Sequence, residues 1–166
     1  APFRPRAGDR GDLRFGFLTA KNAENAKKKM TELEINALCD RVRQTAYEIH
    51  LYLGHGHLEK VYENALAHRL LKEGTRVKQQ HPLRVFDEDG TLIGEYFADL
   101  LVEDVLIVEL KTAKAVAVEH EGQVLAYLKS ARVEHGLLIN FGSPKFQIRK
   151  FARSKASQLN QTHLLK

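Results

Sequence analysis

The sequence has one cysteine, Cys39, and no tryptophan. A single cysteine excludes an internal disulfide, a four-cysteine zinc site and an iron–sulfur cluster. No apolar run approaches the roughly 20 residues that span a bilayer, and the N-terminal segment lacks the apolar core of a signal peptide. We therefore expect a soluble, cytoplasmic protein without a membrane partner.

Familiar catalytic motifs are also missing. The chain has no Gly-rich phosphate loop, no dinucleotide fingerprint and no nucleophilic Ser or Cys constellation, which leaves no competing chemistry of those kinds.

The length and composition of the chain indicate one domain. Its 166 residues and 43% hydrophobic content suit one domain with an ordinary core.

The net charge of +5 is unevenly distributed. Residues 1–29 hold eight Lys/Arg and three Asp/Glu, residues 30–142 hold 12 against 18, and residues 143–166 hold six Lys/Arg and no acid. Basic ends suit phosphate and a carboxylate excess suits a metal ion, but solvated surface charge is the commoner explanation for each. Charge alone assigns no function.

Residues 1–29 combine Pro, Gly and charge without a sustained apolar period, and Met30 opens the first well-patterned region. We interpret this segment as a disordered basic extension. The alternatives are an upstream reading-frame start, with Met30 as the original initiator, and a nucleic-acid-binding arm. Residues 30–166 then form a single domain.

The apolar periodicity predicts an α/β fold. Helices are expected from Thr31 to Gly54, over 58–74 and over 117–131, and strands over 76–86, 91–102, 105–111, 136–141 and near 146–151. The core stripe of the second helix is expected to be Leu58, Val61, Tyr62, Ala65, Leu66 and Leu70. The first three strands are expected to form a β-meander.

Three charged residues occupy the stretch "ADLLVEDVLIVELK", where a buried strand favours apolar side chains. Alternation places Glu109 and Lys111 on one strand face. A two-residue loop would set Asp99 opposite Val108, and a three-residue loop of residues 102–104 would set it opposite Ile107. An odd-length loop or a bulge is therefore required to bring all three charges together.

Two carboxylates about one strand apart suit Mg²⁺, which prefers oxygen ligands and keeps several waters. An adjacent lysine can orient a metal-activated water and stabilise charge on a phosphate. The alternative is that Asp99 and Glu109 are strand-edge charges that oppose aggregation.

Asp99, followed by Glu109-x-Lys111 at the end of the next strand, resembles the signature of the PD-(D/E)XK nuclease superfamily, with Ala98 in place of its proline. That resemblance implies a restriction-endonuclease-like core with a mixed central β-sheet flanked by helices.

A narrower resemblance comes from "GHLEKVY", in which Gly56, Glu59 and Tyr62 match the Gly-x-x-Glu-x-x-Tyr pattern of the GxxExxY proteins. The likeness continues through "QHP", "HEGQVLAYL" and "GLLINFG" and covers roughly residues 34–151. It implies a Mg²⁺ or Mn²⁺ site formed by Glu59, Asp99, Glu109 and the backbone carbonyl of Leu110, with Lys111 beside it.

Gln123 and Tyr127 resemble the Q-x-x-x-Y element of the RecB-like branch, and their spacing puts both on one helical face. The resemblance implies that they orient phosphate or Lys111. The alternative is a tyrosine packed on the sheet with the glutamine at its edge.

Two functions remain. The first is a metal-dependent nuclease acting on nucleic acid, with DNA favoured over RNA, and with Arg149, Lys145 and Lys150 as weak candidates for phosphate contacts. The second is a catalytically silent nucleic-acid-binding or protein-interaction module on the same fold, since a fold does not establish activity. The intact Asp99 and Glu109-x-Lys111 set favours the enzyme.

Deletion of residues 1–29 should leave folding intact, because this segment has no repeating apolar face to contribute to a core. We expect the melting temperature of a chain beginning at Met30 to match that of the full chain. A large decrease would reject the interpretation of residues 1–29 as an extension.

Overall fold

The computed structural model describes residues 29–153. The described elements are α2 (Glu32–Leu53), α3 (Glu59–Lys72), β1 (Val77–Phe86), β2 (Leu92–Val102), β3 (Leu106–Lys111), α4 (Val118–Ala131), β4 (His135–Asn140) and β5 (Gln147–Ala152). Each element lies where the sequence predicted it, within a few residues at its ends. The predicted N-terminal extension, apart from Lys29, lies outside the described residues.

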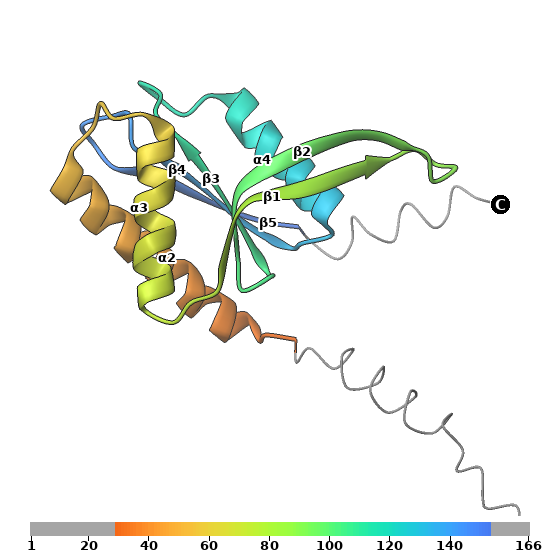
Figure 1. Cartoon of the computed structure of the whole chain (residues 1–166), viewed down its shortest axis with the longest axis horizontal. Coiled ribbons are helices and arrows are strands. Elements are labelled where there is room, and N and C mark those ends of the chain that lie inside the picture. The colour runs from red at the N-terminus through yellow and green to blue at the C-terminus, as the bar shows by residue number, and fades with distance from the viewer. Residues whose placement is uncertain (1–28, 154–166) are drawn as a thin grey trace, which may run out of the picture. The chain divides into compact units, whose positions relative to one another are not determined.

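The strands form one mixed sheet in the order β1-β2-β3-β4-β5 (Figure 1). β1, β2 and β3 are an antiparallel meander, β4 runs parallel to β3, and β5 is antiparallel to β4. A parallel pair needs a crossover connection, and α4 provides it between β3 and β4. The predicted α/β fold class with a mixed central sheet is confirmed.

Helices cover both faces of the sheet. On one face α4 packs so closely on β4 that a Cβ at Gly136 would lie 2.9 Å from Val124 Cγ1. On the other face Tyr62 of α3 stacks on Phe141 with ring centroids 4.4 Å apart, and His50 of α2 contacts the same phenylalanine. The described part of the chain contains no helix with the length and apolar character needed to span a bilayer.

The predicted core stripe of α3 was wrong at two positions. Leu58 is 78% exposed and Val61 is 40% exposed, whereas Glu63 and Ala67 are buried. Leu58 precedes the first turn of the helix and so does not share its inner face. Glu63 can be buried because Lys60, Gln79 and Gln80 all donate hydrogen bonds to its carboxylate.

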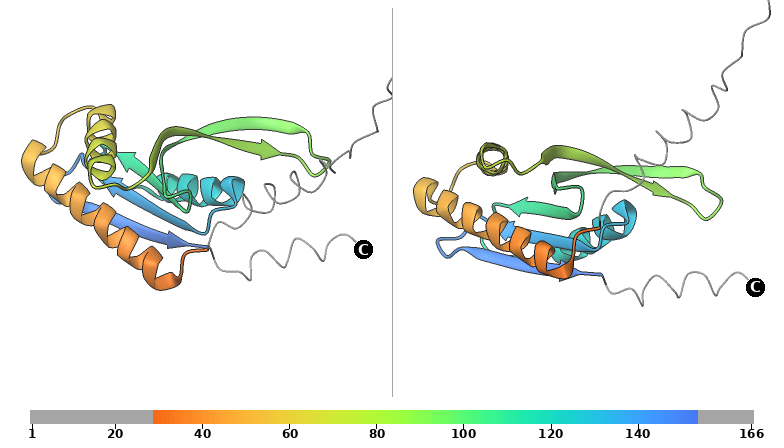
Figure 2. Two further views of the ribbon diagram at one scale, coloured as in Figure 1. Left: turned by 60° about the horizontal axis from the view of Figure 1, so that its bottom comes forward. Right: turned by 90° about the horizontal axis from the view of Figure 1, so that it is seen from below.

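The β1–β2 hairpin extends well beyond the other strands (Figure 2). β2 pairs with β1 along most of its length, but its pairing with β3 covers only Leu100 to Val102. Tyr96, on the extended part of the hairpin, lies against Tyr127 of α4 with ring centroids 5.6 Å apart. Beyond its short pairing with β3, the hairpin is therefore supported by α4.

The chain segment after β3 is held against the end of β4 by the fully buried Asn140. Its Oδ1 accepts hydrogen bonds from the N–H groups of Ala113 (3.0 Å) and Gly142 (3.1 Å), and its Nδ2 donates to the Ala113 carbonyl at 2.8 Å. Phe141 N–H also donates to the Lys111 carbonyl at 2.7 Å. These bonds fix where the backbone goes immediately after Lys111.

Replacing Gly142 with alanine should be strongly destabilising. The added Cβ would lie 2.2 Å from the carbonyl carbon of Thr112 and 2.5 Å from the Ala113 nitrogen, so the backbone itself would have to move. We expect a loss of about 3 kcal/mol, at the upper end of overpacking effects, in denaturant unfolding.

Gly122→Ala in α4 is the matched control, since a Cβ there meets nothing within 4 Å. Higher helix propensity should stabilise that variant by about 1 kcal/mol. Equal stabilities for the two variants would contradict the close approach of Gly142 to the segment after Lys111.

Candidate active site

The turn between β2 and β3 sets the register of the two strands. Val105 N–H bonds to the Val102 carbonyl at 3.1 Å around a turn in which Glu103 and Asp104 have positive φ values of 51° and 59°. Pairing nevertheless begins with Val102 opposite Leu106, so Val105 is an extra residue. The loop is odd in length, but it comprises residues 103–105, not the 102–104 considered from the sequence.

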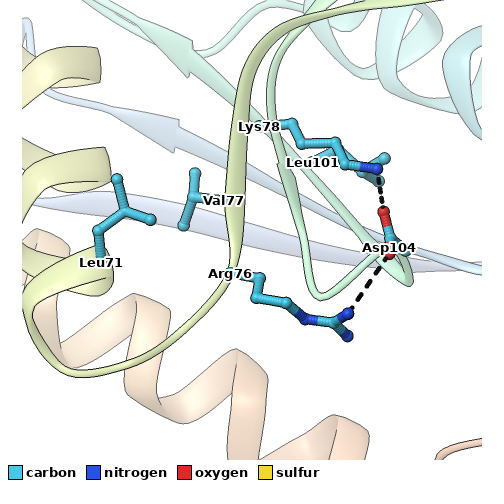
Figure 3. A pocket seen from close by; sticks show the side chains of 6 residues that line it. All are labelled: Leu71, Arg76, Val77, Lys78, Leu101 and Asp104. Carbon is cyan, nitrogen blue, oxygen red and sulfur yellow. Dashed lines mark hydrogen bonds and ion pairs between the residues drawn. The ribbon is translucent and has the colours of Figure 1, made fainter.

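Ion pairs from the start of β1 hold this turn. Arg76 pairs with Glu103 at 2.8 Å, and Lys78 pairs with Asp104 at 2.6 Å. Three of these residues, Arg76, Lys78 and Asp104, also border a pocket of about 370 Å³, whose other lining residues are Leu71, Val77 and Leu101 (Figure 3). This pocket contains none of the predicted catalytic residues, and its charged groups stabilise two left-handed residues that lack the freedom of glycine.

The register continues one step beyond the last backbone pair to place Asp99 against Glu109. Asp99 N–H donates to Glu109 Oε1 at 3.2 Å, and Leu110 N–H donates to Asp99 Oδ2 at 2.8 Å. Each carboxylate therefore satisfies a backbone donor of the opposing strand. Each also keeps lone pairs for a further partner.

Lys111 lies beside these two carboxylates, with its Nζ 3.8 Å from Glu109 Oε2. Asp99, Glu109 and Lys111 together form a contact group. Glu109 is only 2% exposed. Burial, followed by repulsion from Asp99, raises the pKa of Glu109 from its ordinary 4.5 to about 8, although the Lys111 ammonium opposes the shift. Folding thus brings together two carboxylates that repel each other in a poorly solvated position.

The pKa values of Asp99 and Glu59 are raised by the same environment. The pKa of Asp99 is raised chiefly by burial, against the lowering effect of its hydrogen bond from Leu110. Burial also raises the pKa of Glu59, while Lys111 lowers it and Asp99 raises it further. Glu59, in the first turn of α3, therefore lies within electrostatic reach of the group formed by Asp99, Glu109 and Lys111.

The donor set fits a divalent cation through two carboxylates. Among residues 29–153, no three His, Cys, Asp or Glu side chains are grouped closely enough to hold one metal ion. Mg²⁺ needs only one or two protein carboxylates, because it retains waters and takes substrate phosphate oxygens. Asp99 and Glu109 meet that requirement, whereas Glu59 and the Leu110 carbonyl remain predicted ligands.

Gln123 and Tyr127 lie on one face of α4, as their spacing predicted, and are hydrogen bonded to each other at 2.9 Å. Tyr127 is 6% exposed, and its pKa is raised mainly by burial and further by Glu109 and Asp99. The tyrosine therefore packs on the sheet and lies within electrostatic reach of both carboxylates.

The three basic residues considered for phosphate contacts do not form one surface. Arg149 pairs with Glu121 of α4, whereas Lys150 contacts Asn36 of α2, so their side chains point to opposite faces of the sheet. Lys145 lies in the connection between β4 and β5, where its backbone N–H bonds to Ser143 Oγ.

The contacts of Tyr62 give a structural reason for the Gly-x-x-Glu-x-x-Tyr spacing of Gly56, Glu59 and Tyr62. Its hydroxyl donates to the Gly54 carbonyl at 2.8 Å and accepts from His57 N–H at 3.2 Å, which closes the loop before α3. Gly56 has a φ of 109°, which residues with side chains rarely adopt. The loop and the tyrosine together fix the helix turn that carries Glu59.

Sequence reasoning missed two residues beside the site, Glu63 and Gln80. Glu63 is a buried carboxylate one helical turn after Glu59, and Gln80 donates to both Glu63 and Asp99. Glu63 lay outside the predicted stripe, although its spacing of four and seven residues from Ala67 and Leu70 puts it on one helix face with them. The strand pattern around Gln80 is that of a solvent-facing residue, and the available signal was the place of Gln80 in the "QHP" stretch of the family likeness.

A comparison with models of known protein families found a match. The sequence model of the PD-(D/E)XK nuclease superfamily matches residues 36–151, which include all the charged residues of the site. The chain belongs to the PD-(D/E)XK nuclease superfamily. Its mixed five-stranded sheet with flanking helices is consistent with a restriction-endonuclease-like fold.

Nine chains of solved structures match this PD-(D/E)XK protein, among them the crystal structure of SSO0001. That match has 14% sequence identity and a TM-score of 0.46, and it covers 90% of this chain and 83% of the other. A search of curated proteins found no match.

The metal-free protein should lose stability as pH rises from about 4.5 to about 8. The folded-state pKa of Glu109 lies above its ordinary value, so the folded state binds this proton more tightly than the unfolded state does in that window. Glu109→Gln should remove the effect. Its melting temperature should exceed that of the parent at pH 8 by about 3 °C for each kcal/mol relieved, and the excess should shrink toward pH 5.

Glu48→Gln provides the control, because Glu48 is exposed on α2, where the side-chain amide of Gln44, four residues earlier, donates a hydrogen bond to its carboxylate. Its melting curve should follow the parent at every pH. If the Glu109→Gln curve also runs parallel to the parent, Glu109 does not titrate as described.

Proposed function

We propose that this chain is a Mg²⁺- or Mn²⁺-dependent nuclease that hydrolyses phosphodiester bonds, acting on DNA in preference to RNA. The observation that carries the proposal is the contact group of Asp99, Glu109 and Lys111. Superfamily membership indicates a nuclease, and the partly buried Asp99 together with the buried Glu109 adds a donor set suited to a hard cation. The pattern of Gly56, Glu59 and Tyr62 further supports placement among the GxxExxY proteins.

A bound divalent cation would supply Lewis-acid stabilisation of the phosphate and a water of lowered pKa. Asp99 and Glu109 would hold it, with their orientation fixed by the N–H group of Leu110 and the N–H group of Asp99. Lys111, 16% exposed, would reach the substrate from beside Glu109 and stabilise negative charge that develops on the phosphate.

Gln123 and Tyr127 would act at the edge of the site, in keeping with the RecB-like branch. Their mutual hydrogen bond orients both polar groups on the α4 face beside the carboxylates. A buried tyrosine hydroxyl with an amide partner is well suited to position a phosphate or the ammonium of Lys111. The direct partner of Gln123 in the structure is Tyr127.

The test is a cleavage screen on single- and double-stranded DNA and RNA with Mg²⁺, Mn²⁺ or EDTA. DNA should be cleaved only with metal, and Asp99→Asn or Glu109→Gln should lower the rate by about 100-fold or more. Lys111→Ala should remove cleavage but retain Mn²⁺ binding, because an ammonium is not a metal ligand.

Lys114→Ala is the matched control, since Lys114 is an exposed lysine three residues after Lys111. It should cleave at the parent rate. Cleavage that survives EDTA, or a Lys111→Ala variant as active as Lys114→Ala, would overturn the proposal. Nucleic-acid binding without cleavage under every condition would favour the catalytically silent binding module.

A further inference from the structure

Gln80 has an unusual backbone conformation in the middle of β1. Its φ is 48°, in the left-handed region that side chains disfavour. Gln79 pairs with Leu100 and His81 with Ala98, so Gln80 lies directly across from Asp99. Backbone outliers of this kind persist where surrounding contacts hold them, and they concentrate at functional sites.

The side chain of Gln80 connects two carboxylates. Its Nε2 donates to Glu63 Oε2 at 2.8 Å and to Asp99 Oδ1 at 3.3 Å. The second oxygen of Asp99 accepts the Leu110 N–H, so both oxygens of this carboxylate have a donor. Glu63 is itself held by Lys60 Nζ at 2.6 Å. An amide –NH₂ group has two hydrogens and can serve both carboxylates at once.

We propose that Gln80 is a positioning residue that ties Asp99 to the buried Glu63 and so fixes the direction in which Asp99 presents its carboxylate to the cation. The proposal rests on the proposed function, because it deepens the role of Asp99 as a ligand. Partners that orient a metal-ligating carboxylate affect metal affinity although they do not touch the metal. Glu63, anchored on α3, is the fixed point against which Asp99 is held.

Gln79 offers a matched control within the same strand. Its amide also donates to Glu63, at 2.9 Å, but its second bond is to Asn64 Oδ1 on α3. Gln79→Ala therefore removes a partner of Glu63 without removing the bond to Asp99. If Gln80 served only to attach β1 to α3, substitutions at the two positions would have the same consequences.

The decisive variant is Gln80→Gly, which removes the amide and favours the left-handed backbone. Gln80 is exposed, so the core is left unchanged. In the metal-free protein, the Leu110 amide should exchange with solvent about tenfold faster than in the parent by NMR, with Val108 in the same strand as reference. Mn²⁺ affinity, measured by electron paramagnetic resonance of the free ion, should fall about tenfold.

Gln79→Ala should leave Leu110 exchange and Mn²⁺ affinity within twofold of the parent. If Gln80→Gly does not fold, Gln80→Asn gives the same comparison, because asparagine tolerates left-handed backbone and its amide is one methylene shorter. Unchanged Leu110 exchange and unchanged Mn²⁺ affinity in the Gln80 variant would overturn the inference. A parent protein that binds no Mn²⁺ and cleaves nothing would instead reject the proposed function, while the exchange measurement would still decide whether Gln80 holds Asp99.

Discussion

The reciprocal bonding of Asp99 and Glu109 is the interaction on which the candidate site depends. Each carboxylate accepts a backbone N–H from the opposing strand, at 3.2 Å and 2.8 Å, where the regular ladder between β2 and β3 has ended. Because side chains alternate along a strand, a slip of one residue would oppose Asp99 to an apolar side chain and leave Glu109 buried without its donor. Strand register therefore decides whether Asp99 and Glu109 lie together with backbone donors or whether Glu109 is buried without one.

That register is held at both ends of β3. At its start, Arg76 and Lys78 pair with the two left-handed residues of the turn, Glu103 and Asp104. At its end, Asn140 holds the segment after Lys111. β2 and β3 share only three backbone pairs, so these contacts outside the ladder contribute much of what keeps the strands in place.

The elements could be predicted because their signals are local: apolar periods, and turn residues such as Gly54, Gly74 and the "DEDG" stretch. The pattern of Asp99 followed by Glu109-x-Lys111 can also be recognised along the sequence, and it predicted the central residues of the candidate site. The predicted site required an odd-length loop or a bulge, and the loop is odd. Its residues, 103–105, could not be predicted, because the sequence of Glu103 and Asp104 does not indicate two successive positive φ values. The family likeness included Gln80 in its "QHP" stretch, but the role of this residue could not be predicted, since its contacts join elements far apart in the sequence.

If the carboxylate pair holds a cation as proposed, cation binding and folding would be linked through it. A charge on Glu109 is disfavoured by burial and by Asp99, and Lys111 only partly offsets this at 3.8 Å from one of its oxygens. A divalent cation between Asp99 and Glu109 would favour the ionised form of both, so it would lower the pKa of Glu109 and stabilise the folded state together. The cation would bind more weakly at low pH, because protons compete for Glu109. The metal-free fold would thus be least stable at the pH values at which the cation would bind best, so the repulsion between the two carboxylates would favour binding.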